Sequence, residues 1–257
     1  MVSFTVILFV LVLQFLAKYM EDLFGKGIES AVLALGETDA RLCHMMYHAD
    51  GRLAASIVET IDHISLHTRQ AFPWPSRTHS TAKQYTAEQP APSMPRGVKY
   101  DEIIPAPNET DLKGWGVRCI GSGVFQPHEI GPTGRVGAQG FLGRTTETIG
   151  HLREAWPELH EAEYRDAGGS AALLEAFITM GRPAELGDGY DFYSGIHSAT
   201  ENTRRLFHNL VDVVTGENLF SMTGIGCLFN LKTRKLVKTA PEHLEQLNSD
   251  KIKAFSV

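Results

Sequence analysis

Apolar and polar residues alternate in three short runs in the first part of the chain. These runs cover residues 32–35, 41–47 and 53–61 and are separated by turn residues. The last two flank Asp50-Gly51, which favours a hairpin because glycine tolerates a positive φ. The pattern predicts three consecutive antiparallel strands.

The same pattern recurs about 165 residues later, at 203–214 and 219–231. Internal repeats constrain a fold more strongly than single motifs do. The matched strings are Arg41-Leu42-Cys43-His44 with Arg205-Leu206-Phe207-His208, Asp50-Gly51-Arg52-Leu53 with Thr215-Gly216-Glu217-Asn218-Leu219, Ser65-Leu66-His67-Thr68-Arg69 with Asn230-Leu231-Lys232-Thr233-Arg234, and Leu23-Phe24-Gly25-Lys26-Gly27 with Glu185-Leu186-Gly187-Asp188-Gly189. The offset is 164 for the first pair of strings, which precedes the turn glycine, and 165 from that glycine to the third pair, as expected if the second turn has one extra residue. The upstream pair is offset by 162.

A different pattern precedes the second meander. A strand is predicted over 115–125, followed by closely spaced glycines between 131 and 143. Ile149, Leu152 and Trp156 are spaced so that they share one helical face, which predicts a helix over 137–156. The first copy has no equivalent helix-bearing segment, so we expect it to be abbreviated.

Seven prolines between residues 72 and 109 interrupt the two repeats. Proline fixes φ and removes a backbone donor, so neither a regular helix nor a central strand is expected there. The expected organisation is a partial unit of strands only at 1–72, a Pro-rich linker at 73–109, a complete unit at 110–246 and a tail at 247–257.

Composition narrows the function classes. The net charge of −6 does not favour a nucleic-acid partner, which would require a basic face. Three widely spaced cysteines fit buried thiols in a reducing compartment, so we expect a cytoplasmic protein. The apolar run 1–13 is short for a membrane span, and its β-branched residues favour a buried strand; a secretion signal or anchor and an amphipathic helix are the alternatives. No membrane partner is expected.

Several strings resemble a known family. They are Asp39-Ala40-Arg41-Leu42-Cys43-His44-Met45-Met46, Asp50-Gly51-Arg52-Leu53-Ala54-Ala55, Leu66-His67 with Arg69, and Phe72-Pro73. They resemble the closing strands of hot-dog acyl-CoA thioesterases, most closely those of the betainyl-CoA thioesterase-like group. The segment 124–151 resembles the opening strand, loop and helix of the same superfamily. The resemblance implies an α+β double hot-dog, in which an antiparallel sheet wraps around a long central helix and the N-terminal unit is abbreviated.

The family often carries Pro-x-Glu-x-Asp-x-x-Gly-His before its helix. This chain has Pro127 and Glu129 in place, but Gly131 stands where the aspartate would be and Arg135 where the histidine would be. The family's carboxylate is therefore missing from its usual position.

Thioester hydrolysis needs a carboxylate to activate water and donors for the oxyanion. Glu129 and Glu147 are the candidate carboxylates. His151 lies four residues beyond Glu147, so the two side chains share a helix face, and Thr146 could orient a water. The alternative is that these charged side chains only form exposed ion pairs. The candidate substrate-binding residues are Gly134, Arg135, Val136, Gly137, Arg204 and Arg205. The glycine-rich approach to the helix permits close contact with a carbonyl, and the two arginines suit the phosphates of coenzyme A.

The leading hypothesis is hydrolysis of an acyl-CoA thioester or related ester. The alternatives are a non-catalytic acyl-binding or interaction protein and an ester or lactone hydrolase on the same scaffold. Beyond coenzyme A as part of the substrate, no cofactor is implied, and no metal-binding motif is present. A half hot-dog leaves an apolar sheet uncovered, so a homodimer or higher oligomer is expected.

Overall fold

The computed structural model describes residues 27–98, 107–131 and 133–253. The chain forms two compact units, Met1–Met94 (unit 1) and Pro95–Val257 (unit 2), and each is described by itself. The strand predicted over 1–13 lies outside the described residues.

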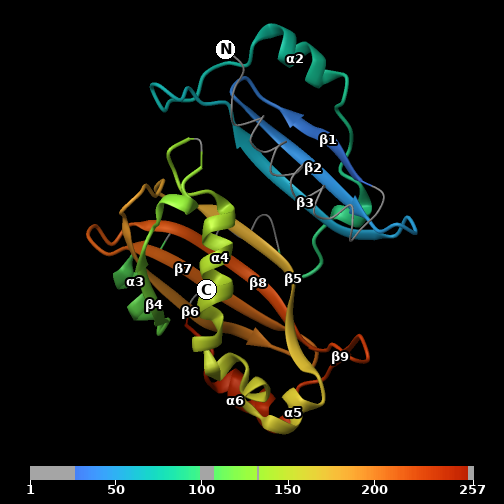
Figure 1. Cartoon of the computed structure of the whole chain (residues 1–257), viewed down its shortest axis with the longest axis vertical. Coiled ribbons are helices and arrows are strands. Elements are labelled where there is room, and N and C mark those ends of the chain that lie inside the picture. Colours follow the sequence, from blue (N-terminus) through green and yellow to red (C-terminus); the bar gives the residue numbers. More distant parts are fainter. Residues whose placement is uncertain (1–26, 99–106, 132, 254–257) are drawn as a thin grey trace. The chain divides into compact units, whose positions relative to one another are not determined.

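Unit 1 contains a three-stranded antiparallel sheet in the order β1-β2-β3, shown in blue in Figure 1. Its elements are β1 (Ile28–Leu35), β2 (Asp39–Tyr47), β3 (Leu53–Asp62), α2 (Ser76–Lys83) and a short 3-10 turn at Ala91–Ser93. The predicted meander is confirmed, and Gly51 in its hairpin has a φ of +84°. Leu42 of β2 pairs with Val32 of β1 and Glu59 of β3.

The prediction that no regular helix lies between 72 and 109 is wrong, because α2 occupies Ser76–Lys83. Pro75 stands at the N-cap of α2, where the fixed φ of proline does not disturb a helix. The next proline is Pro90, so the sequence between the two is free to form a helical turn.

Unit 2 contains a six-stranded sheet in the order β4-β6-β7-β8-β5, with β9 paired to the end of β8. Its strands are β4 (Arg118–Val124), β5 (Gly169–Met180), β6 (Gly189–Ala199), β7 (Arg204–Asp212), β8 (Asn218–Asn230) and β9 (Lys235–Val237). Its helices are α3 (Glu109–Trp115), α4 (Ala138–Thr148), α5 (Ala162–Asp166) and α6 (Pro241–Ser249).

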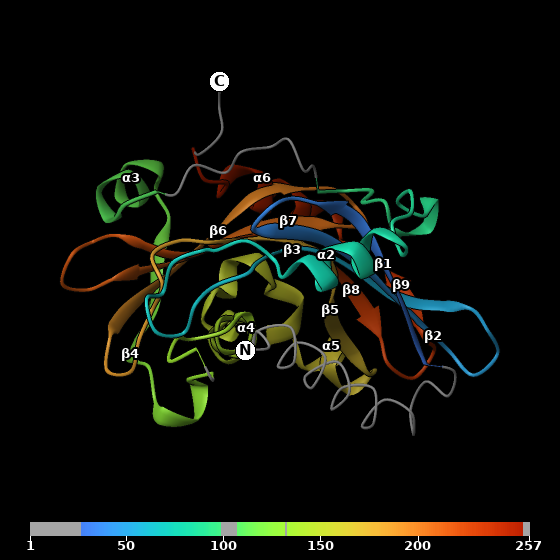
Figure 2. The same cartoon turned by 90° about the horizontal axis from the view of Figure 1, so that it is seen from above.

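Helix α4 lies against one face of this sheet in both views (Figures 1 and 2). Phe141 of α4 is fully buried and stacks on Phe220 of β8 with ring centroids 4.9 Å apart. The opposite face is covered by Leu112 of α3 and by Ile252, which pack with Phe207. The sheet therefore has an apolar core on both sides, and α4 is the helix that its inner face encloses.

Helix α4 is shorter than the predicted 137–156, because it ends at Thr148 and continues only as short 3-10 turns. The hydroxyls of Thr145, Thr146 and Thr148 each donate to a carbonyl four residues earlier. Such bonds compete with the helical ladder and favour its distortion. Leu152 and Trp156 are buried although they lie outside α4. Their helical spacing in the sequence therefore correctly indicated buried side chains but not a continuous helix.

The predicted strand over 115–125 also begins too early. Trp115 is the last residue of α3. At the start of this helix, the Asn108 side chain accepts the N–H of Asp111, and the Asp111 side chain accepts the N–H of Asn108. Gly116 then ends the helix with a φ of +77°. The strand starts only at Arg118.

The repeat is visible in strand register as well as in sequence. The irregularity between Val32 and Ala34 in β1 recurs between Ile196 and Ser198 in β6. The shift at Met46 and Tyr47 recurs at Leu210 and Val211.

A backbone conformation is repeated too. Arg69 and Arg234, which are 165 residues apart, are the two non-glycine residues with positive φ among those described, at 58° and 59°. Strands β1, β2 and β3 of unit 1 therefore correspond to β6, β7 and β8 of unit 2.

Candidate active site

The loop before α4 contains four of the predicted substrate-binding residues, Gly134, Arg135, Val136 and Gly137. The N–H of Gly131 donates to the carbonyl of Arg135, and Gly134 has a φ of +75°, which favours glycine. The N–H of Val136 donates to the carbonyl of Ala184 and attaches the loop to the connection between β5 and β6. Gly137 is the N-cap of α4, and no side chain of the described residues caps that end. The first N–H groups of α4 are therefore available to an oxyanion.

Glu129 lies beside this loop as a buried, ionised carboxylate. Its Oε1 accepts from Nε of Arg144 at 2.9 Å, and its Oε2 accepts from Nη2 of Arg144 at 2.6 Å and from the N–H of Gln126 at 2.7 Å. Burial raises the pKa of Glu129, but these hydrogen bonds outweigh it and the pKa lies below the ordinary value. The carboxylate stays charged at neutral pH.

Glu147 has a different environment. Its side chain is 64% exposed and accepts from Nη1 of Arg144 at 2.8 Å. Arg144 therefore joins both candidate carboxylates. Within the described residues, no hydrogen bond links Glu147 to the exposed His151, and the hydroxyl of Thr146 donates to Leu142.

Glu147 and the start of α4 are too far apart to act on one carbonyl. A helix rises 1.5 Å per residue, so ten residues from Gly137 to Glu147 correspond to about 15 Å. Glu129 is closer, because a Cβ placed on Gly140, in the first turn, would lie 3.8 Å from the Glu129 Cβ. The geometry therefore separates the two candidates and leaves Glu129 beside the loop.

Arg204 belongs to the core and not to a phosphate site. It is 1% exposed and donates to the carbonyl of Ala155, to Glu158 and to the hydroxyl of Thr239. Its guanidinium also lies 4.6 Å from the ring centroid of Trp156. Its donors are directed into the protein. Arg205, the next residue of β7, is half-buried.

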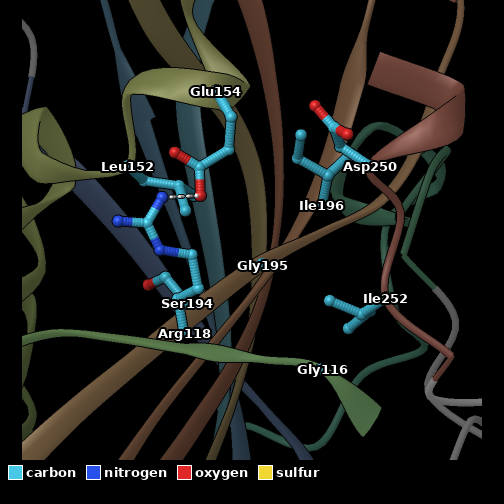
Figure 3. A pocket seen from close by; sticks show the side chains of 9 residues that line it. All are labelled: Gly116, Arg118, Leu152, Glu154, Ser194, Gly195, Ile196, Asp250 and Ile252. Carbon is cyan, nitrogen blue, oxygen red and sulfur yellow. Dashed lines mark hydrogen bonds and ion pairs between the residues drawn. The ribbon is translucent and has the colours of Figure 1, made fainter. Parts of the chain in front are cut away.

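A cavity of about 300 Å³ opens at the opposite end of α4, beside β6 (Figure 3). Its residues are Gly116, Arg118, Leu152, Glu154, Ser194, Gly195, Ile196, Asp250 and Ile252. Arg118 and Glu154 form an ion pair across it at 2.7 Å. Strand β4 begins at Arg118, opposite Ser194, and beyond that pair the N–H of Ile252 donates to the carbonyl of Ile196 on β6. The cavity shares no lining residue with the glycine loop.

The described residues contain no group of three or more His, Cys, Asp and Glu side chains placed to hold a metal ion. None of the helices they form has the length and apolar character needed to cross a membrane.

Solved structures similar to this chain share a hot-dog architecture. An acyl-ACP thioesterase from Bacteroides thetaiotaomicron matches with a TM-score of 0.50 and 12% identity over 77% of this chain and 67% of its own. A probable thioesterase from Escherichia coli matches with a TM-score of 0.42 and 16% identity, over 51% of this chain and 97% of its own. A 12:0-ACP thioesterase from Umbellularia californica matches with a TM-score of 0.45 and 18% identity, over 51% of this chain and 50% of its own. No family model and no curated protein sequence matches the chain.

The Bacteroides match covers more of the chain than the 163 residues of unit 2 can supply, so it extends into unit 1. Together with an antiparallel sheet around α4 and a repeated strand register, it defines the fold. The chain has a hot-dog fold, with a complete unit and, among the residues described, an abbreviated one.

Proposed function

We propose that the protein hydrolyses an acyl thioester at the N-terminal end of α4. The substrate carbonyl lies against Gly137, and the N–H groups of Ala138 and Gln139 donate to the oxyanion. The observation that carries the proposal is the buried, ionised Glu129 next to this uncapped helix end.

Glu129 orients the attacking water in this proposal. Among the described residues, its Oε1 accepts one hydrogen bond, from Arg144, and a carboxylate oxygen has two acceptor sites. The second site can hold a water proton while the water attacks the carbonyl carbon. The leaving thiolate needs no strong acid, because a thiol has a pKa of about 8.5.

The proposed substrate is an acyl-CoA, and an oxygen ester or lactone is the related possibility on the same scaffold. The thioesterases named above suggest the acyl thioester class. The proposed assembly is a homodimer or higher oligomer, which light scattering tests; a monomer would contradict it.

A non-catalytic acyl-binding protein is the second candidate. It is favoured by Gly131 and Arg135 in place of the family's aspartate and histidine, and by the engagement of both Glu129 oxygens. An acyl-CoA panel assayed for released thiol, with binding measured in parallel by calorimetry, separates the two. Turnover supports the hydrolase, whereas saturable binding without thiol release supports the binding protein.

A further inference from the structure

Three polar side chains form a linked series on one face of unit 1. The Ser30 hydroxyl on β1 lies 2.7 Å from Nδ1 of His44 on β2, and Nε2 of His44 lies 3.3 Å from Oε1 of Glu59 on β3. Ser30 and His44 are directly paired in the sheet, and Glu59 lies two residues beyond Ile57, the partner of His44. Since residues two apart share a face, the three side chains lie on the same side.

One tautomer of His44 satisfies both contacts. With the proton on Nε2, the ring donates to Glu59 and leaves Nδ1 to accept the Ser30 hydroxyl. A hydroxyl, an imidazole base and a carboxylate that orients the base form the arrangement that activates a serine nucleophile.

Unit 2 provides an internal comparison for this arrangement. Ser194 and His208 are the repeat counterparts of Ser30 and His44, with Oγ 2.6 Å from Nδ1. The counterpart of Glu59 is Gly224, because Leu42 pairs with Glu59 as Leu206 pairs with Gly224. Ser194 is fully buried, whereas Ser30 is exposed. The Ser–His contact alone is a packing feature of the repeat, so Glu59 and the exposure of Ser30 are specific to unit 1.

The sheet edge also supplies a donor for an oxyanion. The N–H of Val32 donates to the carbonyl of Tyr85, on the side of β1 away from β2. Backbone N–H groups two residues apart in a strand point to the same side, so the N–H of Ser30 is directed to that edge. A carbonyl oxygen held there lies beside the nucleophile itself.

We propose that unit 1 carries a second hydrolytic site, with Ser30 as nucleophile, His44 as base and Glu59 as positioning residue, acting on activated carboxylic esters. The Ser30 Oγ forms a bond to the carbonyl carbon as its proton moves to Nδ1 of His44. The bond to the leaving alkoxide then breaks, and the alkoxide takes that proton. Water deacylates the serine through the same two steps and releases the acid.

The test uses the full chain and an alkyl fluorophosphonate, which phosphonylates an activated serine with loss of fluoride. Peptide mass spectrometry locates the label and time courses give its rate. We expect the label on Ser30, its loss in Ser30→Ala, and its retention in the matched control Ser194→Ala. Glu59→Gln is expected to slow labelling about tenfold or more, because the uncharged amide no longer stabilises the imidazolium. Glu59→Asp is expected to restore part of the rate.

Two results would overturn the proposal. One is the absence of label on Ser30 in a chain whose circular dichroism shows it to be folded. The other is a labelling rate that Glu59→Gln leaves unchanged. Labelling is also expected to persist in Glu129→Gln, which separates this site from the proposed thioesterase site of unit 2.

Discussion

The hydroxyl of Ser194 lies 2.6 Å from Nδ1 of His208, in the interior of unit 2. His208 is 2% exposed and stacks near Phe192, with ring centroids 5.9 Å apart. Burial lowers the pKa of His208 to about 4. The imidazole is therefore neutral in the folded protein at neutral pH.

This pKa predicts a loss of stability on mild acidification. The unfolded histidine titrates near 6.5 and the folded one near 4, so the unfolded state binds the extra proton first as the pH falls. The free energy of unfolding should decrease by about 3 kcal/mol between pH 6.5 and 4. Urea titrations across this range measure it. His208→Gln, which keeps a polar side chain but does not titrate, should flatten the dependence; an equal slope in that variant would contradict the assignment.

The ion pair between Arg144 and Glu129 predicts a large effect of removing the arginine. Their side chains are 19% and 7% exposed, so Arg144→Met leaves a buried carboxylate without its counter-charge. We expect a loss of about 3–5 kcal/mol in the free energy of unfolding. The matched control is Glu147→Gln, which removes the exposed contact of the same arginine and should cost under about 1 kcal/mol. Similar losses of unfolding free energy in the two variants would show that the buried pair with Glu129 contributes no more than the exposed contact with Glu147.

Arg204 should behave as a core residue. Arg204→Met leaves Glu158 buried with its main partner removed, and a loss of about 3 kcal/mol or more is expected in thermal or urea unfolding. The exposed Arg153 provides the control, since Arg153→Met should change stability by less than about 0.5 kcal/mol. If Arg204 instead held coenzyme A phosphates, the variant would fold normally and lose substrate affinity.

Glu175 of β5 fixes the segment that enters unit 2. Its carboxylate accepts the N–H groups of Arg96, Gly97 and Val98 at 2.7–3.2 Å. Burial raises the pKa of Glu175, but these three donors outweigh it and the pKa is lowered. The ionised carboxylate therefore stabilises the attachment above the ordinary pKa of 4.5, and this contribution is lost as the pH falls through the lower folded value.

Glu175→Gln is expected to release this segment and to speed tryptic cleavage after Arg96 by about tenfold, since cleavage follows local opening. Glu242→Gln, an exposed change in α6, serves as the control. Equal cleavage rates in both variants would mean that Glu175 does not hold the segment.

The sequence predicted local features better than long-range ones. The meanders and the repeat were readable because alternation and turn glycines depend on neighbouring residues, as at Gly51 and Gly216. The early end of α4 could not be predicted from the sequence. The helical spacing of Leu152 and Trp156 reflects their burial, and it does not indicate that threonine hydroxyls bond to the helix backbone.

The contacts of the candidate site depend on packing. Glu129 was identified from a motif, but its partner Arg144 lies fifteen residues away across a loop, so the pair appears only when α4 packs on that loop. Ser30 and His44 meet through strand register, which a single sequence does not specify. The recurrence of histidine at 44 and 208 in the matched strings was the available signal, and it does not reveal Glu59.

In the proposed hydrolase, Glu129 is the carboxylate that activates water at the start of α4. The direct measurement is kcat/KM for an acyl-CoA that the wild-type protein hydrolyses, compared between Glu129→Gln and Glu147→Gln with folding verified by thermal unfolding. We expect Glu129→Gln to reduce kcat/KM by about 100-fold or more, mainly through kcat, and Glu147→Gln to leave it within about threefold. Full activity in a folded Glu129→Gln variant would contradict the account.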